Sequence, residues 1–222
     1  YNTVTVGDNA WMIENLRVTH YLNGESIATG LDNTAWSETE TGAYAVYPHN
    51  DLEGLVTDDD VLEAYGALYN WYAVEDERRI CPTDWMVASN NDYNQLTNYL
   101  IDKFKDIEEA NVGNALKSCR QVNSPLSGDC DTSEHPRWDD DAAQGNHGTN
   151  IYNFSALPGG GRDISGEYFM IGEFGLWWTR DAYDTENAYL RNLIYNYSNV
   201  FNETFEKQNG FSVRCVKGLL MN

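Results

Sequence analysis

The last third of the chain carries the clearest structural signal. It contains three motifs, which are Leu157-Pro158-Gly159-Gly160-Gly161-Arg162-Asp163, Leu176-Trp177-Trp178-Thr179-Arg180 and Gly210-Phe211-Ser212-Val213-Arg214-Cys215. A glycine-rich loop, two adjacent tryptophans and a final cysteine-bearing strand are typical of a small sheet beneath irregular loops. We expect strands at 153–157, 176–180, 188–197 and 209–217.

Helical patterns occupy the middle of the chain. Residues 89–105 place apolar side chains on one helical face, and Ser89 or Asn90 can cap the start; these side chains are Tyr93, Leu96, Leu100, Ile101 and Phe104. A shorter second helix is expected at 111–117. The aromatic-rich segment 64–74 is a further helix candidate, ending before Cys81-Pro82.

Strand-like segments stand at both ends of the chain. Residues 3–6 and 11–13 predict two short strands around a turn. Strands, then helices, a long loop and more strands favour an α+β fold, with helices on one side of an antiparallel sheet. We expect the first strand, near Thr3–Val6, to pair with the last, near Ser212–Val216. We also expect one domain over residues 1–222, with a loop insertion at about 120–148.

The composition limits the classes of partner. The chain has 222 residues, 14 basic and 35 acidic, which gives a net charge of −21. Such a surface repels nucleic acids and anionic lipids. No stretch approaches the roughly 20 apolar residues of a membrane helix, so no membrane insertion is expected. No signal peptide is present, and the strand-like start at Tyr1 predicts a mature or trimmed product.

The four cysteines predict two disulfides. Cys119 and Cys130 bracket a short loop, and Cys81 and Cys215 would then tie the middle of the chain to its last strand. Two disulfides indicate an oxidising compartment, which predicts an extracellular or outer-surface location. Four free thiols in a cytosolic protein are the alternative.

An ordered set of motifs resembles a known family. The set comprises Val6-Gly7, Trp11–Leu16, Thr34–Trp36, Gly66–Val74, Cys81–Trp85, Phe154–Gly160, Trp177–Thr179 and Gly210–Cys215. It resembles the Fibrobacter succinogenes major paralogous domain of secreted and surface proteins of Bacteroidota. The resemblance implies a C-type-lectin-like fold with two main helices, a looped antiparallel sheet and neighbouring termini. Two departures are the long segment 120–148 with its cysteine pair, and Met86 where the family usually has His.

Calcium is the one cofactor that the sequence suggests, in a structural role. The Glu-Pro-Asn and Trp-Asn-Asp signatures of sugar-binding C-type lectins are absent. Hard oxygen ligands follow the tryptophan pair at Asp181, Asp184, Glu186 and Asn187. The run Asp139, Asp140 and Asp141 is a second candidate. Solvated acidic turns are the alternative for both sets, since the chain is rich in carboxylates.

Three loops are expected to form a recognition face, namely 120–148, 158–174 and 180–187. Candidate ligand-binding residues there are Trp178, Arg162, Asp163 and Tyr189. Trp177 and Trp178 point to opposite sides of a strand, so one belongs to the core and the other can lie near the loop surface. Packing is the alternative role for both tryptophans.

Catalytic motifs are missing from the sequence. The four histidines are scattered at His20, His49, His135 and His147, and no nucleophile elbow or zinc-protease motif occurs. The leading hypothesis is therefore a non-enzymatic extracellular binding or adhesion module for a glycan or protein ligand. The alternatives are a structural subunit of a surface assembly or filament, which would bind copies of itself, and a carbohydrate-active enzyme.

Overall fold

The structure is a computed structural model of the chain. It describes residues 1–124, 126, 130–131, 134–140 and 145–218, with Asp51 described by its backbone only. The helices are α1 (Asn33–Glu38), the 3-10 helix η1 (His49–Asp51), α2 (Asp58–Tyr65), α3 (Trp71–Glu75), α4 (Asn90–Lys103) and α5 (Val112–Leu116). None of the helices in the described ranges is long and apolar enough to cross a membrane.

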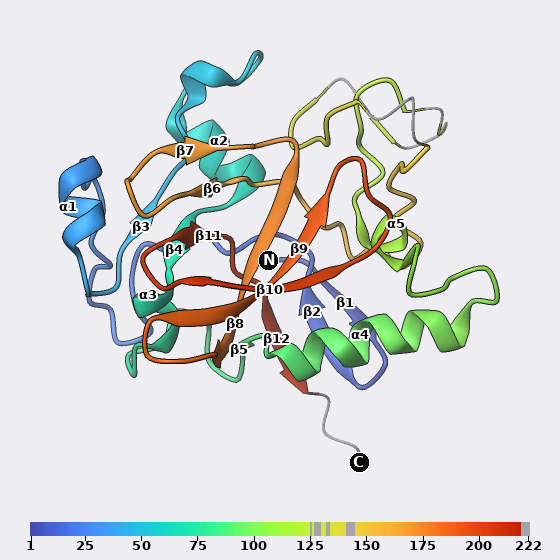
Figure 1. Cartoon of the computed structure of the whole chain (residues 1–222), viewed down its shortest axis with the longest axis horizontal. Coiled ribbons are helices and arrows are strands. Elements are labelled where there is room, and N and C mark those ends of the chain that lie inside the picture. The colour runs from blue at the N-terminus through green and yellow to red at the C-terminus, as the bar shows by residue number, and fades with distance from the viewer. Residues whose placement is uncertain (125, 127–129, 132–133, 141–144, 219–222) are drawn as a thin grey trace.

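The strands form three antiparallel sheets, which gives the α+β architecture that the sequence predicts. The first has the order β1 (Thr3–Val6), β2 (Asn9–Met12), β12 (Cys215–Gly218), β5 (Met86–Val87). The second has the order β10 (Phe201–Glu206), β9 (Asn187–Ile194), β8 (Phe174–Ala182). The third has the order β3 (Tyr44–Ala45), β4 (Leu68–Asn70), β11 (Gly210–Phe211), β6 (Gly161–Arg162), β7 (Tyr168–Phe169). In Figure 1, β8 and β9 cross the middle of the molecule between α1–α3 and α4–α5.

The pairing expected between the first and last strands is wrong in one respect. Strand β1 pairs with β2 in a hairpin, with Val4 opposite Trp11, and β12 pairs with the other edge of β2, with Val216 opposite Trp11. Both terminal strands therefore belong to one sheet, separated by β2. The tight turn at Gly7, whose φ is +60°, favours the local hairpin over a direct contact of the two ends.

The two helices expected after residue 88 are confirmed. Helix α4 begins after Ser89, whose hydroxyl accepts from the Asp92 amide at 3.1 Å, while the Asp92 carboxylate accepts from the Ser89 amide at 2.8 Å. Its buried face carries Tyr93, Leu96 and Leu100. Helix α5 lies inside the expected range and buries four of its residues against the same core.

The segment 64–74 is not the single helix that the sequence suggests. Gly66 has a φ of +83°, and a Cβ there would lie 2.6 Å from the Asn15 side chain, so α2 ends at Tyr65. Three buried residues of β4 then pair with β3 and β11. The Asn70 side chain accepts from the Ala73 amide and starts α3.

Two other strand boundaries also differ from expectation. Residues 153–157 are not a strand, because Asn153 and Ser155 have φ values of +56° and +51°, which extended chain cannot accommodate. The expected last strand at 209–217 is divided into β11 and β12. Between them, Ser212 and Arg214 turn inward to make buried hydrogen bonds. Strand β10 was not anticipated.

A buried arginine connects both ends of the chain to the core. Arg214 is fully buried and donates to the carbonyls of Met12 at 2.8 Å, Phe154 at 2.9 Å and Ser155 at 2.7 Å. Its Nε donates to Asn15 Oδ1 at 2.9 Å. Burial lowers the pKa of Arg214 to about 10, so the side chain stays charged at neutral pH. These four acceptors therefore solvate a charge that water does not reach.

Both predicted disulfides are confirmed. Cys81 bonds to Cys215 across 134 residues, and Cys119 bonds to Cys130 across 11 residues. The first bond lies in the largest core cluster and joins the end of the helical half to β12. The second closes part of the insertion.

We predict that Arg214→Met lowers the free energy of unfolding by on the order of 3 kcal/mol or more, because it leaves buried oxygen atoms without donors. Arg180→Met is the matched control, since the Arg180 side chain is 36% exposed and its contact with Asp92 is long at 3.7 Å. Its cost should stay below about 1 kcal/mol. Urea denaturation of both variants measures the difference, and equal losses would contradict the role assigned to Arg214.

We also predict unequal contributions from the two disulfides. Replacing Cys81 and Cys215 with Ala should cost about 2–5 kcal/mol, because this bond closes the longer loop of the unfolded chain. Replacing Cys119 and Cys130 should cost less and affect mainly the insertion. Denaturation curves of the two double variants provide the comparison. A larger loss from the short pair would show that the insertion supports the core.

Candidate functional site

The three loops expected to form one recognition face do not share one site. The insertion contacts the segment before β8, where the Asp139 amide donates to the Gly172 carbonyl at 2.9 Å. The β8–β9 turn lies at the other end of this nine-residue strand, about 27 Å away at the usual rise per residue. There, Asp181 accepts from the Asn90 amide at 2.6 Å. The segment 158–174 reaches both ends: Gly172 contacts the insertion, and Ile164 lines a separate pocket together with Thr185 and Glu186 of the β8–β9 turn.

Trp178 is not placed to meet a ligand, which corrects the expectation for this residue. The side chain is 0% exposed, and its indole donates to the Tyr69 carbonyl at 2.9 Å. Trp177 is buried on the opposite face and donates to Asn15 at 2.8 Å. Core clusters cover β8 on both faces, so the alternation of a strand brings neither ring to the surface.

Arg162 is likewise a structural residue. Its guanidinium lies 4.4 Å from the Trp36 ring centre and 5.0 Å from that of Tyr168, and it donates to the Gly166 and Leu31 carbonyls. Burial lowers the pKa of Arg162. These bonds use the Nε–H group and one terminal nitrogen of the guanidinium, and they hold the β6–β7 hairpin against α1 and the residues before it.

Asp163 and Tyr189 have different environments. The Asp163 carboxylate accepts from the Ser165 amide and hydroxyl and from the Glu167 amide, which fixes the β6–β7 turn. Tyr189 is half-buried, and its ring packs edge-on against Tyr183 with 5.3 Å between centres. Of the four expected ligand contacts, Tyr189 keeps an accessible ring beside an exposed neighbour.

The acidic residues after β8 are engaged in the turn itself. One Asp184 oxygen accepts from the amides of Glu186 and Asn187 at 2.8 and 2.7 Å, and these bonds lower the pKa of Asp184. Asp181 points instead to the start of α4. Within the described ranges, no three His, Cys, Asp or Glu side chains are grouped so that they could hold a metal ion.

The second acidic run is also dispersed. Asp139 is exposed but lies close to Gly172, and partial desolvation there raises the pKa of its carboxyl group. Asp140 accepts from the Asn123 side chain at 3.3 Å. Asp141 lies outside the described residues.

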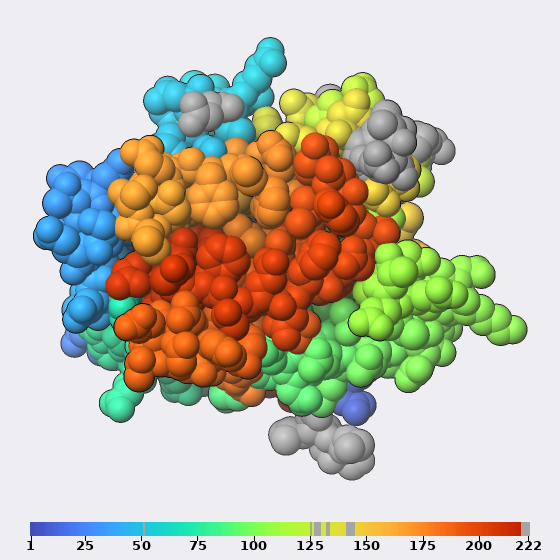
Figure 2. All heavy atoms as spheres, viewed as in Figure 1, coloured from blue at the N-terminus to red at the C-terminus, as the bar shows by residue number. Residues whose placement is uncertain are grey.

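A large cavity lies beside the insertion, in a cleft that sequence reasoning did not identify. We call it the insertion cleft; its volume is about 930 Å³. One wall comes from residues that flank the N-terminal hairpin and from the loop and helix at 54–64. The other comes from the insertion and from the chain on either side of it, at 118–119 and 150–157. The lining residues are Asn2, Ile13, Glu14, Arg17, Gly54, Leu55, Val56, Asp60, Glu63, Ala64, Ser118, Cys119, Arg120, His135, Pro136, Asn150, Ser155 and Leu157. In Figure 2, a notch separates the cyan and yellow-green projections that carry these walls.

His135 links the two walls of the cleft. Its Nδ1 lies 2.7 Å from the Tyr65 hydroxyl, and its Nε2 lies 3.0 Å from the Glu53 carbonyl. A carbonyl only accepts, so Nε2 carries the proton and Nδ1 accepts from Tyr65 in the neutral ring. Burial lowers the pKa of His135, which favours this neutral form.

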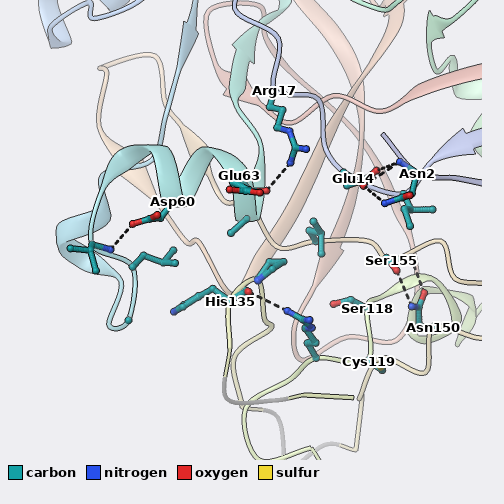
Figure 3. Close-up of a pocket in the computed structure, with 18 residues that line it drawn as sticks. Asn2, Glu14, Arg17, Asp60, Glu63, Ser118, Cys119, His135, Asn150 and Ser155 are labelled. Atoms are coloured by element: carbon teal, nitrogen blue, oxygen red, sulfur yellow. Dashed lines mark hydrogen bonds between the residues drawn. The ribbon is translucent and has the colours of Figure 1, made fainter. Parts of the chain in front are cut away.

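Most carboxylates of the cleft are already hydrogen-bonded. Glu14 accepts from the Asn2 amide and side chain, and Asp60 accepts from the Val56 and Thr57 amides (Figure 3). Arg17 donates to the Glu63 carbonyl at 3.1 Å. The cleft thus combines fixed polar groups with the aliphatic side chains of Ile13, Leu55, Val56 and Leu157.

We predict that the His135 link weakens as pH falls. The folded-state pKa of His135 is lowered, so the unfolded chain binds a proton near pH 6.5 that the folded chain resists. Stability should therefore be full above that pH and decrease below it. Melting curves from pH 7.5 to 5 test this, with His135→Gln as the control that removes one titrating group. Identical pH slopes for both proteins would contradict the prediction.

The expectation for calcium stays a prediction. Any bound Ca²⁺ should be structural, and core folding should not require it, because the described acidic turns are closed by their own amides. Calorimetric titration of Ca²⁺ into EDTA-treated protein, with parallel melting curves, tests both statements. Collapse of the fold in EDTA would contradict them.

Comparison with known proteins places the chain in a family. Curated proteins and solved structures yielded no match. A family model, the Fibrobacter succinogenes major domain, matches residues 4–217. The matched range contains most of β1 and of β12, all four cysteines and every residue that lines the insertion cleft apart from Asn2. Because the match covers nearly the whole sequence, the chain belongs to the Fibrobacter succinogenes major domain family.

Proposed function

We propose that this chain is a non-enzymatic extracellular binding module, and that its ligand, a protein or a glycan, occupies the insertion cleft. The observation that carries the proposal is the cleft itself, about 930 Å³ in volume, between two projecting walls. Ligand sites are commonly concave, with apolar side chains and a few fixed polar groups, and this lining has that composition.

Covalent and hydrogen-bonded contacts hold the two walls of the cleft in place, as expected for a preformed site. The Cys119–Cys130 bond constrains the insertion wall, and His135 connects it to Glu53 on the other wall. A preformed cleft loses little conformational entropy when a ligand binds. The disulfides are compatible with an oxidising, extracellular location. The looped α+β architecture is compatible with kinship to C-type-lectin-like domains.

The hydrogen bonding of the cleft supports binding over catalysis. His135 is the histidine that lines it, and both ring nitrogens are occupied by Tyr65 and Glu53. A general base needs a free ring nitrogen facing the substrate. Glu14 and Asp60 are held by amide donors, an arrangement that positions the walls.

A structural subunit of a surface assembly is the second candidate, and two exposed rings favour it. Tyr183 is 58% exposed in the β8–β9 turn, and Tyr197 is 51% exposed between β9 and β10. Tyrosine is frequent at protein interfaces because it combines a large ring with a polar end. Light scattering of the purified chain separates this candidate from a monomeric binding module.

The proposed function predicts that a ligand binds less tightly when a residue of the cleft wall is changed. The full chain is screened against a glycan array and a phage-displayed peptide library, with Ca²⁺ and with EDTA. Val56→Asp places a charge on an apolar wall residue that is 76% exposed, so it should reduce binding at least about tenfold with little effect on stability.

Tyr183→Asp is the matched control, because it makes the same kind of change at the distant β8–β9 turn. It should leave the affinity unchanged. Ligands that resist Val56→Asp but are lost with Tyr183→Asp would move the site to the turn. A failure of both screens to yield any ligand would count against a binding module.

A further inference from the structure

One side of the insertion cleft carries hydrogen-bond donors for which no acceptor is seen in the described part of the chain. Ser118 lines the cleft and is 5% exposed, yet its hydroxyl is buried without a hydrogen-bond partner in the described part of the chain. A buried hydroxyl that makes no hydrogen bond is costly, and such groups commonly mark a position completed by another molecule. Figure 3 places Ser118 beside Cys119, below the open centre of the cleft.

Arg120 stands two residues further along the same wall. One of its terminal nitrogens donates to the His135 carbonyl at 3.1 Å, which fixes the side chain and leaves other N–H groups unassigned. Among the described residues, neither Arg120 nor Arg17 has a carboxylate within ion-pair distance. Their guanidinium charges therefore have no carboxylate partner in that part of the chain, although the sequence has 35 acidic and 14 basic residues.

Arg17 brings a second guanidinium from the opposite wall. It donates to the Glu63 carbonyl and lies 5.5 Å from the Tyr1 ring centre, so it is held in place by uncharged partners. In Figure 3, Arg17 and Ser118 lie on opposite sides of the open centre. A planar guanidinium with free N–H groups matches the geometry of a carboxylate.

We propose that the ligand of the insertion cleft is a peptide segment whose side-chain carboxylate binds Arg120 and Ser118, with Arg17 closing on the same segment. The inference rests on the proposed function. The remaining lining favours a peptide over a sugar, because its apolar side chains are aliphatic and no Phe, Tyr or Trp ring is among the described residues that line the cleft. The imidazole of His135 is also in the lining, and both of its ring nitrogens are engaged by Tyr65 and Glu53. Sugar rings are bound chiefly by stacking on aromatic faces, whereas aliphatic walls suit the side chains that flank an Asp or Glu.

The net charge of −21 sets the conditions for this recognition. An anionic segment is repelled at long range, so association is slow at low salt and depends on contacts made inside the cleft. Local pairing with two arginines then selects a segment with one carboxylate among apolar residues, rather than a highly acidic chain. Moderate salt screens the repulsion more than it weakens the enclosed pair.

The test uses random twelve-residue peptides displayed on phage, followed by synthetic copies of the enriched peptides with blocked ends. Each copy is paired with one in which Asp or Glu is replaced by Asn or Gln. The carboxylate form should bind on the order of tenfold more tightly than the amide form. Arg120→Gln should remove this preference for the carboxylate form, and Ser118→Ala should reduce it. Arg17→Gln removes the guanidinium of the opposite wall and should also reduce the preference.

Arg180→Gln, at the distant β8–β9 end, should leave the preference intact, and melting curves confirm that each variant is folded. Peptides that bind in a Val56-dependent manner without any carboxylate preference would overturn the inference and leave the proposed function standing. Preferential binding of trigalacturonate, lost in Arg120→Gln, would replace the peptide with an acidic glycan. The absence of any cleft-dependent ligand would overturn both proposals.

Discussion

The burial of Arg214 is the constraint on which the rest of the structure depends. A guanidinium removed from water must find oxygen acceptors within the protein, and here three are main-chain carbonyls. They belong to Met12 in the N-terminal hairpin and to Phe154 and Ser155 in the segment after the insertion. One side chain near the C-terminus thereby fixes the relative positions of two segments separated by more than a hundred residues.

Asn15 extends this constraint from the core to the cleft. Its Oδ1 accepts from Arg214 and Trp177, and its Nδ2 donates to the Tyr65 carbonyl at 2.8 Å. The Tyr65 hydroxyl in turn meets His135, which reaches the Glu53 carbonyl. This continuous series of hydrogen bonds makes the cleft walls part of the same polar network as the core, so their separation is set by the fold.

Much of the fold could be predicted from the sequence because its signals are local. The cap at Ser89, the apolar face of α4 and the two cysteine pairings require only short-range patterns or simple spacing. The errors arose where tertiary contacts decide the backbone. Gly66 ends α2 because Asn15 lies against it, and Ser155 adopts a positive φ in the segment whose carbonyls face Arg214. Neither neighbour is visible from adjacent residues.

The candidate site was harder to predict than the fold, because the chain has many more carboxylates than a binding site would use. In a chain with 35 acidic residues, carboxylates attract attention as metal ligands, although Asp184 and Asp60 serve their own turns. The informative groups are the scarce cations that the acids leave alone. Arg17 and Arg120 are 103 positions apart in sequence, and tertiary contacts such as the Arg214 and Asn15 network and the His135 link bring their walls together. The proposed site therefore rests on two arginines held by uncharged partners and lining a cleft, beside a buried hydroxyl without a hydrogen-bond partner in the described part of the chain, and not on the abundance of carboxylates.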